Sequence, residues 1–177
     1  MTGLPDCIPR TVLVSNLVSM LGMQKGHCTY LELGTAYNET LEFVAKASPQ
    51  ARCIGVDRKA VDPGLPNVTV YSMETAEYLA QFAGADGPFD VAYIDADHNF
   101  PAVLADFRAV VPSMADQSLI LLDDTWPVSR ETAAPGYCSD AYRMYSWLRL
   151  SGAESVTIPA YPGLTIVRIK GAHLQWS

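Results

Sequence analysis

The sequence lacks the features that mark membrane-bound, secreted or nucleic-acid-binding proteins. It has no apolar run near the ~18 residues that a membrane-spanning helix needs. Its start, MTGLPDCIPR, lacks the basic-then-apolar order of a signal peptide. It also has no Lys/Arg-rich run, and its net charge is −7, so a nucleic-acid backbone or an anionic membrane is a poor partner. These absences predict a soluble, cytoplasmic protein with no nucleic-acid or membrane partner.

Cysteine is scarce and scattered. The four cysteines, Cys7, Cys28, Cys53 and Cys138, form no CxxC pair and no cluster with histidine. A zinc site or a disulfide framework therefore does not fit this pattern. Cys28 and Cys53 lie beside predicted strands, where a thiol usually acts as a small buried hydrophobe. The pattern agrees with a reducing compartment.

An internal repeat and a low-complexity linker are also missing. The 177 residues are 49% hydrophobic and 18% charged, which is ordinary for one globular domain with a buried core. We therefore expect a single domain over residues 1–177. Within it, residues 1–28 form an N-terminal helix and lead-in, and residues 29–170 form the core.

Short apolar runs alternate with helix-like segments along the chain. The apolar runs predict strands at residues 29–33, 52–56, 68–71, 89–94, 118–122, 154–158 and 164–169. The helix-like segments span residues 8–21, 40–47, 75–82, 101–111 and 139–150. We expect the first helix to end near Gly22. Apolar strands between helices indicate an α/β fold with a mostly parallel sheet covered on both faces.

Carboxylates follow the predicted strands at the points where the strands end. Right-handed crossovers place all β-to-α turns at one edge of a parallel sheet, and ligands bind at that edge. Burying unpaired charge is costly, so folding alone does not account for this many acids there. The carboxylates are Glu32, Asp57, Glu74, Asp95, Asp123 and Asp124. Their positions predict a ligand site.

The stretch LELGTAYNET, residues 31–40, predicts a strand, a turn and the start of a helix. Gly34 allows the backbone to approach a ligand closely, and the helix start offers free N–H groups. Asp57 follows Glu32 by about 25 residues, a spacing typical of an acid that binds ribose hydroxyls. An ordinary tight turn and a helix cap remain alternatives. Since GxGxxG is missing, the pattern favours a nucleoside-type ligand without a pyrophosphate.

The fourth and fifth predicted strands end in IDADH and LDDT. Adjacent strand ends lie ~5 Å apart, so Asp95, Asp123 and Asp124 can converge on one hard divalent cation such as Mg²⁺, Mn²⁺ or Ca²⁺. His98 can act as a general base near neutral pH. The alternative is that Asp97 and His98 only cap the next helix and that one of the two later aspartates faces solvent.

The segment after LDDT has the composition of a functional loop. Trp126 directly follows the acidic pair and is a candidate wall of the substrate pocket. Residues 127–139 are rich in Pro, Gly, Ser and Thr without clear periodicity. A loop of this length is more often functional than accidental, so we expect a mobile lid or a substrate loop here.

In LELG, IDADH and LDDT, the chain resembles class I S-adenosylmethionine-dependent methyltransferases. The resemblance runs over residues 30–169 and is nearest to the small-molecule O-methyltransferases with DxDH and LDDT motifs. It implies a Rossmann-like, doubly wound, mostly parallel seven-stranded sheet with an antiparallel last strand and helices on both faces. The activity it implies is methylation of a small hydroxylated acceptor.

The resemblance also implies roles for individual residues. The implied S-adenosylmethionine-binding residues are Glu32, Gly34, Thr35, Ala36, Asn38, Thr40, Asp57, Arg58, Met73, Glu74, Thr75 and Asp95. In the metal-dependent branch of the family, Asp95, Asp123 and Asp124 match the metal ligands. Asp95 would lie beside the reacting groups, and His98 would deprotonate the acceptor hydroxyl.

Two departures from the family pattern leave other functions open. Asn38 stands where a second glycine is usual, and Glu39 adds an acid nearby; Asn is the residue that best replaces glycine at positive φ. The chain has no insertion that forms a substrate cap, which fits a small acceptor or a homo-oligomer whose partner completes the site. The alternatives are a sugar-nucleotide glycosyltransferase using Asp95 and Asp97 as its DxD motif, and an inactive cofactor-binding subunit.

Overall fold

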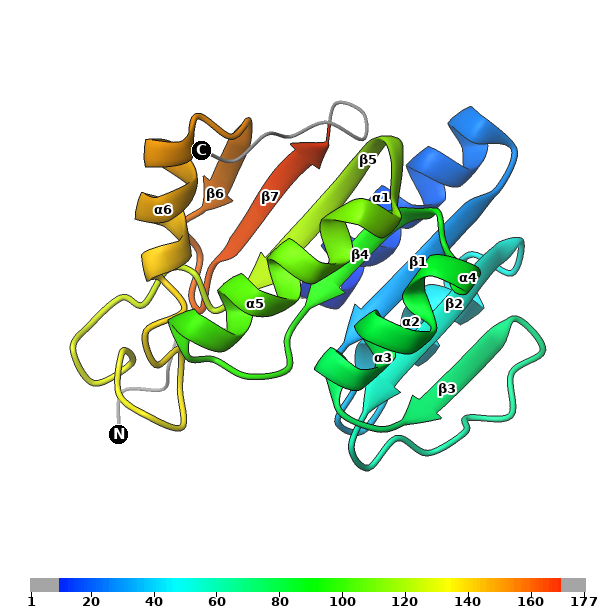
Figure 1. Ribbon diagram of the computed structural model, residues 1–177, viewed down its shortest axis with the longest axis horizontal. Helices are drawn as coiled ribbons and strands as arrows, with labels where there is room; N and C mark the ends of the chain where they lie inside the picture. The colour runs from blue at the N-terminus through cyan, green and yellow to red at the C-terminus, as the bar shows by residue number, and fades with distance from the viewer. Residues whose placement is uncertain (1–9, 170–177) are drawn as a thin grey trace.

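A seven-stranded sheet forms the centre of the computed structural model, which describes residues 10–169 (Figure 1). The strands are β1 (Cys28–Leu33), β2 (Ala51–Asp57), β3 (Val68–Ser72), β4 (Phe89–Ile94), β5 (Met114–Asp123), β6 (Ser155–Ile158) and β7 (Leu164–Ile169). Their order is β3-β2-β1-β4-β5-β7-β6. β7 runs antiparallel to β5 and β6, and the other neighbouring pairs are parallel. The predicted Rossmann-like fold, with its antiparallel last strand, is confirmed.

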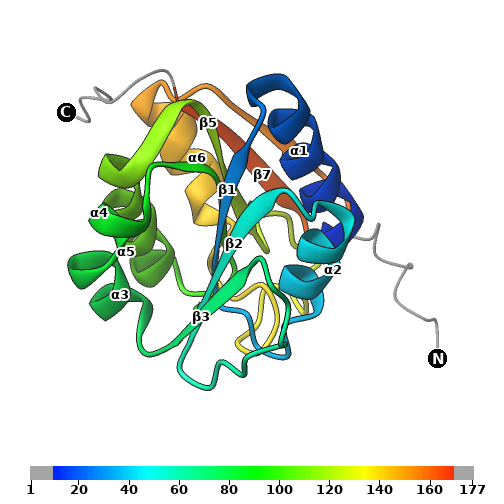
Figure 2. The same ribbon diagram turned by 90° about the vertical axis from the view of Figure 1, so that its right-hand side faces the viewer.

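Helices cover both faces of the sheet. They are α1 (Arg10–Lys25), α2 (Glu39–Ala47), α3 (Thr75–Gln81), α4 (Ala83–Asp86), α5 (Phe100–Val110) and α6 (Arg143–Ser151), with a 3₁₀ turn at Val111–Ser113. α1 and α2 pack on one face, and α3, α4 and α5 on the other (Figure 2). All six residues of β4 are buried, as expected for a central strand covered on both sides. Within the described residues, no helix has the length and apolar character of a membrane span.

The first helix extends beyond its predicted end. α1 continues past Gly22, which is buried inside the helix near Cys28 and Gln50. The helix ends at Lys25. The next residue, Gly26, has a φ of +80°, and its N–H donates to the Gly22 carbonyl at 2.9 Å. A glycine in this left-handed conformation commonly ends a helix. The predicted end was wrong because the second glycine is the terminator; residues 8–9 lie outside the described part of the chain.

Two other boundaries differ from the prediction by four residues. α6 begins at Arg143 rather than at Ser139. Ser139 has a φ of +47°, which a right-handed helix cannot contain. β5 begins four residues before the predicted start at Ser118 and includes Gln117 at φ +58°, and its pairing with β4 shifts register in this region. The apolar pattern identifies only the regular half of this strand.

Candidate functional site

Two adjoining cavities open at the carboxyl edge of the sheet, with volumes of about 590 and 680 Å³. The walls that they share are Gly34, Asp57, Ala96, His98, Gly136 and Tyr137. The predicted residues on the first cavity are Glu32, Gly34, Thr35, Ala36, Thr40, Asp57, Asp95, His98 and Asp124. Those on the second are Gly34, Asp57, Arg58, Met73, Glu74, Thr75 and His98. Of the predicted site residues, Asn38 and Asp123 line neither cavity.

The turn after β1 is held by backbone geometry. Gly34 has a φ of +91°, and a Cβ built there would clash with the Asp95 carbonyl and with Ala96. Glycine is therefore required by the neighbouring end of β4, whatever ligand binds. Asn38 also has a left-handed φ, +63°, and its Nδ2 donates to the Val61 carbonyl at 2.5 Å. The Asn38 side chain thus links the turn to the loop after β2.

Asp57 lies where the two cavities meet. One of its carboxylate oxygens accepts from the Ala36 N–H at 3.0 Å, and the other accepts from the Lys59 N–H at 2.8 Å. These bonds fix the orientation of the carboxylate. Each oxygen has a second lone pair, so the carboxylate can still accept hydrogen bonds from a ligand.

The floor of the first cavity is polar and buried. Tyr30 donates to Glu32 at 2.6 Å, and burial raises the pKa of Glu32 to about 8. The Thr35 hydroxyl is buried beside the cavity, and no described residue hydrogen-bonds to it. A buried hydroxyl without a partner is costly. This observation fits a polar ligand group that binds at Thr35.

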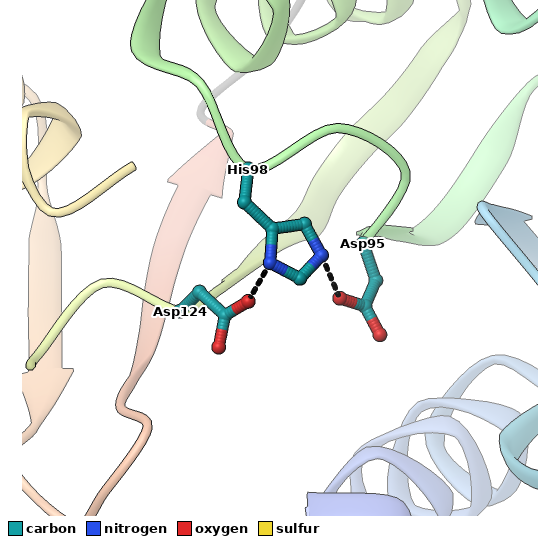
Figure 3. A group of neighbouring side chains, drawn as sticks. All are labelled: Asp95, His98 and Asp124. Carbon is teal, nitrogen blue, oxygen red and sulfur yellow. Dashed lines mark ion pairs between the residues drawn. The ribbon is translucent and has the colours of Figure 1, made fainter. Parts of the chain in front are cut away.

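Asp95, His98 and Asp124 come together at the ends of β4 and β5 (Figure 3). The imidazole lies between the carboxylates: Nδ1 pairs with Asp124, and Nε2 is 3.7 Å from Asp95 Oδ1. Nδ1 also donates to the Tyr137 carbonyl at 2.8 Å. One potential ligand atom from each of the three side chains lies within 4.8 Å of the others. The two predicted catalytic residues are therefore neighbours.

Asp123 lies apart from this cluster. Its carboxylate is buried and forms an ion pair with Arg10 of α1. Asp124 follows the last residue of β5 and has a left-handed φ of +57°, and Asp124 but not Asp123 belongs to the group whose ligand atoms lie within 4.8 Å of one another. The structure brings His98, rather than Asp123, together with the two other predicted ligands.

The charges around His98 determine its protonation. Its hydrogen bond to Asp124 is the main cause that raises the pKa of His98 to about 9, against the opposing effect of burial. Burial raises the pKa of Asp95 to about 6. In this arrangement the imidazole is protonated at neutral pH. The imidazole can act as a base only after its pairing with Asp124 is broken and its proton is lost.

The segment after β5 covers the site. Gly136 and Tyr137 line both cavities, and the Phe100 N–H donates to Asp140 at 2.5 Å. Trp126 lines neither cavity; its ring packs edge-on against Tyr145, with centroids 5.8 Å apart. The loop is thus part of the site, but the aromatic residue of the loop that lines the cavities is Tyr137 rather than Trp126. The polar, aperiodic sequence of this segment indicates a loop but does not show which of its side chains faces the cavities.

The walls of the two cavities are strongly acidic. Eight carboxyl groups line them, against two arginines and one histidine. The carboxyl groups are those of Glu32, Glu39, Asp57, Glu74, Asp95, Asp97, Asp106 and Asp124. Glu32, with its raised pKa, is mainly protonated at neutral pH. Such a lining favours ligands that carry positive charge or N–H and O–H donors, and it disfavours phosphates.

The strand order, the antiparallel β7 and the ligand pocket at the carboxyl edge define a class I methyltransferase fold. Residues 13–125 match a family described as a methyltransferase domain, and the chain belongs to that family. The predicted class of enzyme is confirmed. No curated protein sequence matches the chain.

Solved structures share the fold. The O-methyltransferase TomG from Streptomyces achromogenes, in complex with SAM, is 17% identical, with a TM-score of 0.65 over 97% of this chain and 84% of that one. An O-methyltransferase from Bacillus cereus, in complex with SAH, is 20% identical, with a TM-score of 0.65 over 94% and 84%. MycE of mycinamycin biosynthesis, with Mg, SAH and mycinamycin VI, is 18% identical, with a TM-score of 0.64 over 87% of this chain and 49% of MycE.

Proposed function

We propose that this protein transfers a methyl group from S-adenosylmethionine to a hydroxyl oxygen of a small molecule. The observation that carries the proposal is the pair of acid-lined cavities, which meet at Asp57 and border the Asp95–His98–Asp124 cluster. Family membership supports methyl transfer. The SAM and SAH complexes of the structural neighbours TomG and the Bacillus cereus enzyme support the choice of cofactor.

The pocket fits the chemical groups of this cofactor. Its walls are suited to a sulfonium cation and an ammonium group, and it has no glycine-rich cradle for a pyrophosphate. When bound, S-adenosylmethionine supplies the methyl group to the acceptor oxygen. Asp57 accepts hydrogen bonds from the ribose hydroxyls, and Glu32 and Thr35 bind the methionine end. Thr75 borders the cavity that takes the base.

The cluster at the ends of β4 and β5 also fits a divalent cation. Two carboxylates and one imidazole, from Asp95, Asp124 and His98, match the preferences of Mn²⁺ and other first-row metals better than those of Mg²⁺ or Ca²⁺. When bound, such an ion lowers the pKa of the acceptor hydroxyl. The structure of MycE, which shares this fold, contains Mg, and this supports a divalent cation as a partner. His98 then either ligates the ion or, freed from Asp124, accepts the hydroxyl proton.

The competing functions have less support. A DxD glycosyltransferase needs Asp95 and Asp97 to act together, but an Asp97 oxygen accepts from the Asn99 N–H at 3.0 Å, outside the three-residue cluster. The acidic walls also disfavour a nucleotide diphosphate. The alternative of an inactive subunit rests on the asparagine at position 38. The Asn38 side chain has a structural role, because it holds the turn in place through its hydrogen bond to Val61.

The setting of the reaction is part of the same proposal. The acceptor is a small hydroxylated molecule, and a second copy of the chain is a candidate to complete its site. The protein acts in the cytoplasm, where thiols stay reduced. Cys28, Cys53 and Cys138 support this placement because all three are free and buried.

Calorimetric titration with S-adenosylmethionine and S-adenosylhomocysteine tests the proposal. We expect binding with a Kd below 1 mM, and Asp57→Asn should weaken it by about 10-fold or more, since hydrogen bonds to a charged acceptor are lost. The matched control is Asp62→Asn, in the exposed loop after β2, which should leave the Kd unchanged. If neither ligand produces heat at millimolar concentration, the proposed cofactor is wrong.

A further inference from the structure

Asp106, on α5, is a buried carboxylate that the roles above do not use. It is 6% exposed and borders the second cavity. Both of its oxygens accept from the Thr75 hydroxyl, at 3.0 and 3.1 Å. One hydroxyl has a single hydrogen to give, whereas a carboxylate has about four acceptor positions. Among the described residues, Thr75 is the hydrogen-bond partner found for Asp106, so most of its acceptor capacity is left for a ligand.

Residues of two helices, α3 and α5, line the second cavity around Asp106. Ala102, Ala105 and Asp106 share one side of α5, at the i, i+3, i+4 spacing. Ala76 of α3 borders the same cavity. Methyl groups on both helices leave room for a flat, apolar ring and offer it no hydrogen bonds. A planar ligand in this part of the cavity therefore meets the Asp106 carboxylate at the edge of its ring.

The charge of Asp106 determines which chemical group the edge of the ligand's ring must carry. Burial, and secondarily the nearby Asp97, raise the pKa of Asp106 to about 6, and the Thr75 hydrogen bond opposes them. The side chain is thus mainly ionised at neutral pH and accepts hydrogen bonds without donating any. A ring with an amino group satisfies it. A ring with a carbonyl oxygen in that place leaves two acceptors facing each other.

We infer that Asp106 accepts a hydrogen bond from the exocyclic amino group of the cofactor's purine and so selects a 6-aminopurine. The inference rests on the proposed function, which places the ribose at Asp57, a residue shared by both cavities. From there the base extends into the second cavity, between α3 and α5. Asp106 is thereby a specificity-determining residue, and Thr75 orients its carboxylate.

The test compares S-adenosylhomocysteine with S-inosylhomocysteine, in which a carbonyl replaces the amino group. By calorimetry, the full-length wild-type protein should prefer the adenosyl compound by about 30-fold, the effect of a hydrogen bond to a charged group. Asp106→Asn should reduce the preference to about 3-fold or less, because a carboxamide can also donate to the carbonyl. Asp116→Asn, an exposed acid on β5, is the matched control and should retain the full preference.

The outcomes separate this inference from the proposed function. If the wild-type protein binds both compounds equally, or if folded Asp106→Asn keeps the full preference, the inference is overturned and the proposed function stands. If neither compound binds, the proposed function itself fails. A purely structural role for Asp106 would lower Tm in the variant without changing the ratio of the two Kd values. If the variant does not fold, equal binding of the two compounds by the wild-type protein would still overturn the inference.

Discussion

The two halves of the site are held in place by different forces. After β1, the chain is fixed by backbone geometry: Gly34 fits against the end of β4, and Asn38 is tied to Val61. After β4 and β5, the site is fixed by charge, because His98 lies between Asp95 and Asp124. A site held by geometry tolerates changes of pH and salt but not of side-chain volume. A site held by charge has the opposite sensitivities.

The largest effect should come from adding one methyl group to the geometric half. Gly34→Ala places a Cβ against backbone atoms of Asp95 and Ala96 and forces a non-glycine residue to a φ of +91°. We expect a loss of about 3 kcal/mol or more in the free energy of unfolding, measured with urea. Binding of S-adenosylhomocysteine should also fall by at least about 100-fold.

Gly64→Ala is the control for backbone strain alone. Gly64 also has a positive φ, +69°, but nothing lies within 4 Å of a Cβ there. We expect this change to cost about 1 kcal/mol, the penalty of the left-handed conformation. Equal losses in the two variants would show that the contact with β4 is unimportant.

The second prediction separates two neighbouring aspartates. Asp124→Asn should weaken Mn²⁺ binding by about 100-fold, because it removes a charged ligand from the cluster. Asp123→Asn should change Mn²⁺ affinity by less than about 3-fold. It should instead lower the free energy of unfolding by about 2 kcal/mol, because Arg10 loses its partner. Electron paramagnetic resonance of free Mn²⁺ measures the binding. Loss of binding in the Asp123 variant would restore the three-aspartate metal site that the sequence predicts.

The third prediction concerns pH in the charged half. His98 has a folded pKa of about 9, above its ordinary value, so its pairing stabilises the protein fully below about pH 6.5. This stabilisation is lost as the pH rises through 9. Because the side chain is 39% exposed, we expect only about 1 kcal/mol. In metal-free buffer, the difference in unfolding free energy between wild type and His98→Gln should shrink by that amount from pH 7 to 10. A constant difference would mean that the pairing is absent in solution.

The smallest effect is expected at Asn38. Asn38→Gly removes the hydrogen bond to Val61 but relieves a φ of +63°. The two terms are each about 1 kcal/mol and opposite in sign, so the net stability change should stay within about 0.5 kcal/mol. Cofactor affinity should change by less than about 3-fold in titration. A larger loss of affinity would give the side chain a direct part in binding.

Most of the fold could be predicted because it depends on local pattern. Apolar runs and the turns between them identify the strands, and right-handed crossovers bring their ends to one edge. Helix ends were harder: Gly22 and Gly26 look equivalent in sequence, and only packing places the first one inside α1. The irregular part of β5 around Gln117 has no apolar alternation to reveal it.

The site was predictable in its members but not in its pairings. The strand-end acids follow from topology, whereas the partner of Asp123 is Arg10, more than a hundred positions away in the chain. Asp106 had a local signal, since it falls on the apolar side of its helix, between Val103 and Val110. An acid on such a side needs a partner or a ligand. Which of these it has depends on Thr75, on a different helix.

The fit of Gly34 against Ala96 has a consequence for how such a protein can diverge over evolutionary time. The two positions belong to separate motifs, yet a side chain at position 34 would collide with the backbone of Asp95 and Ala96. A substitution of Gly34 would therefore press on the backbone that carries the Asp95 side chain. Position 34 can therefore change in evolution only together with a compensating shift at the end of β4, whatever acceptor the protein uses.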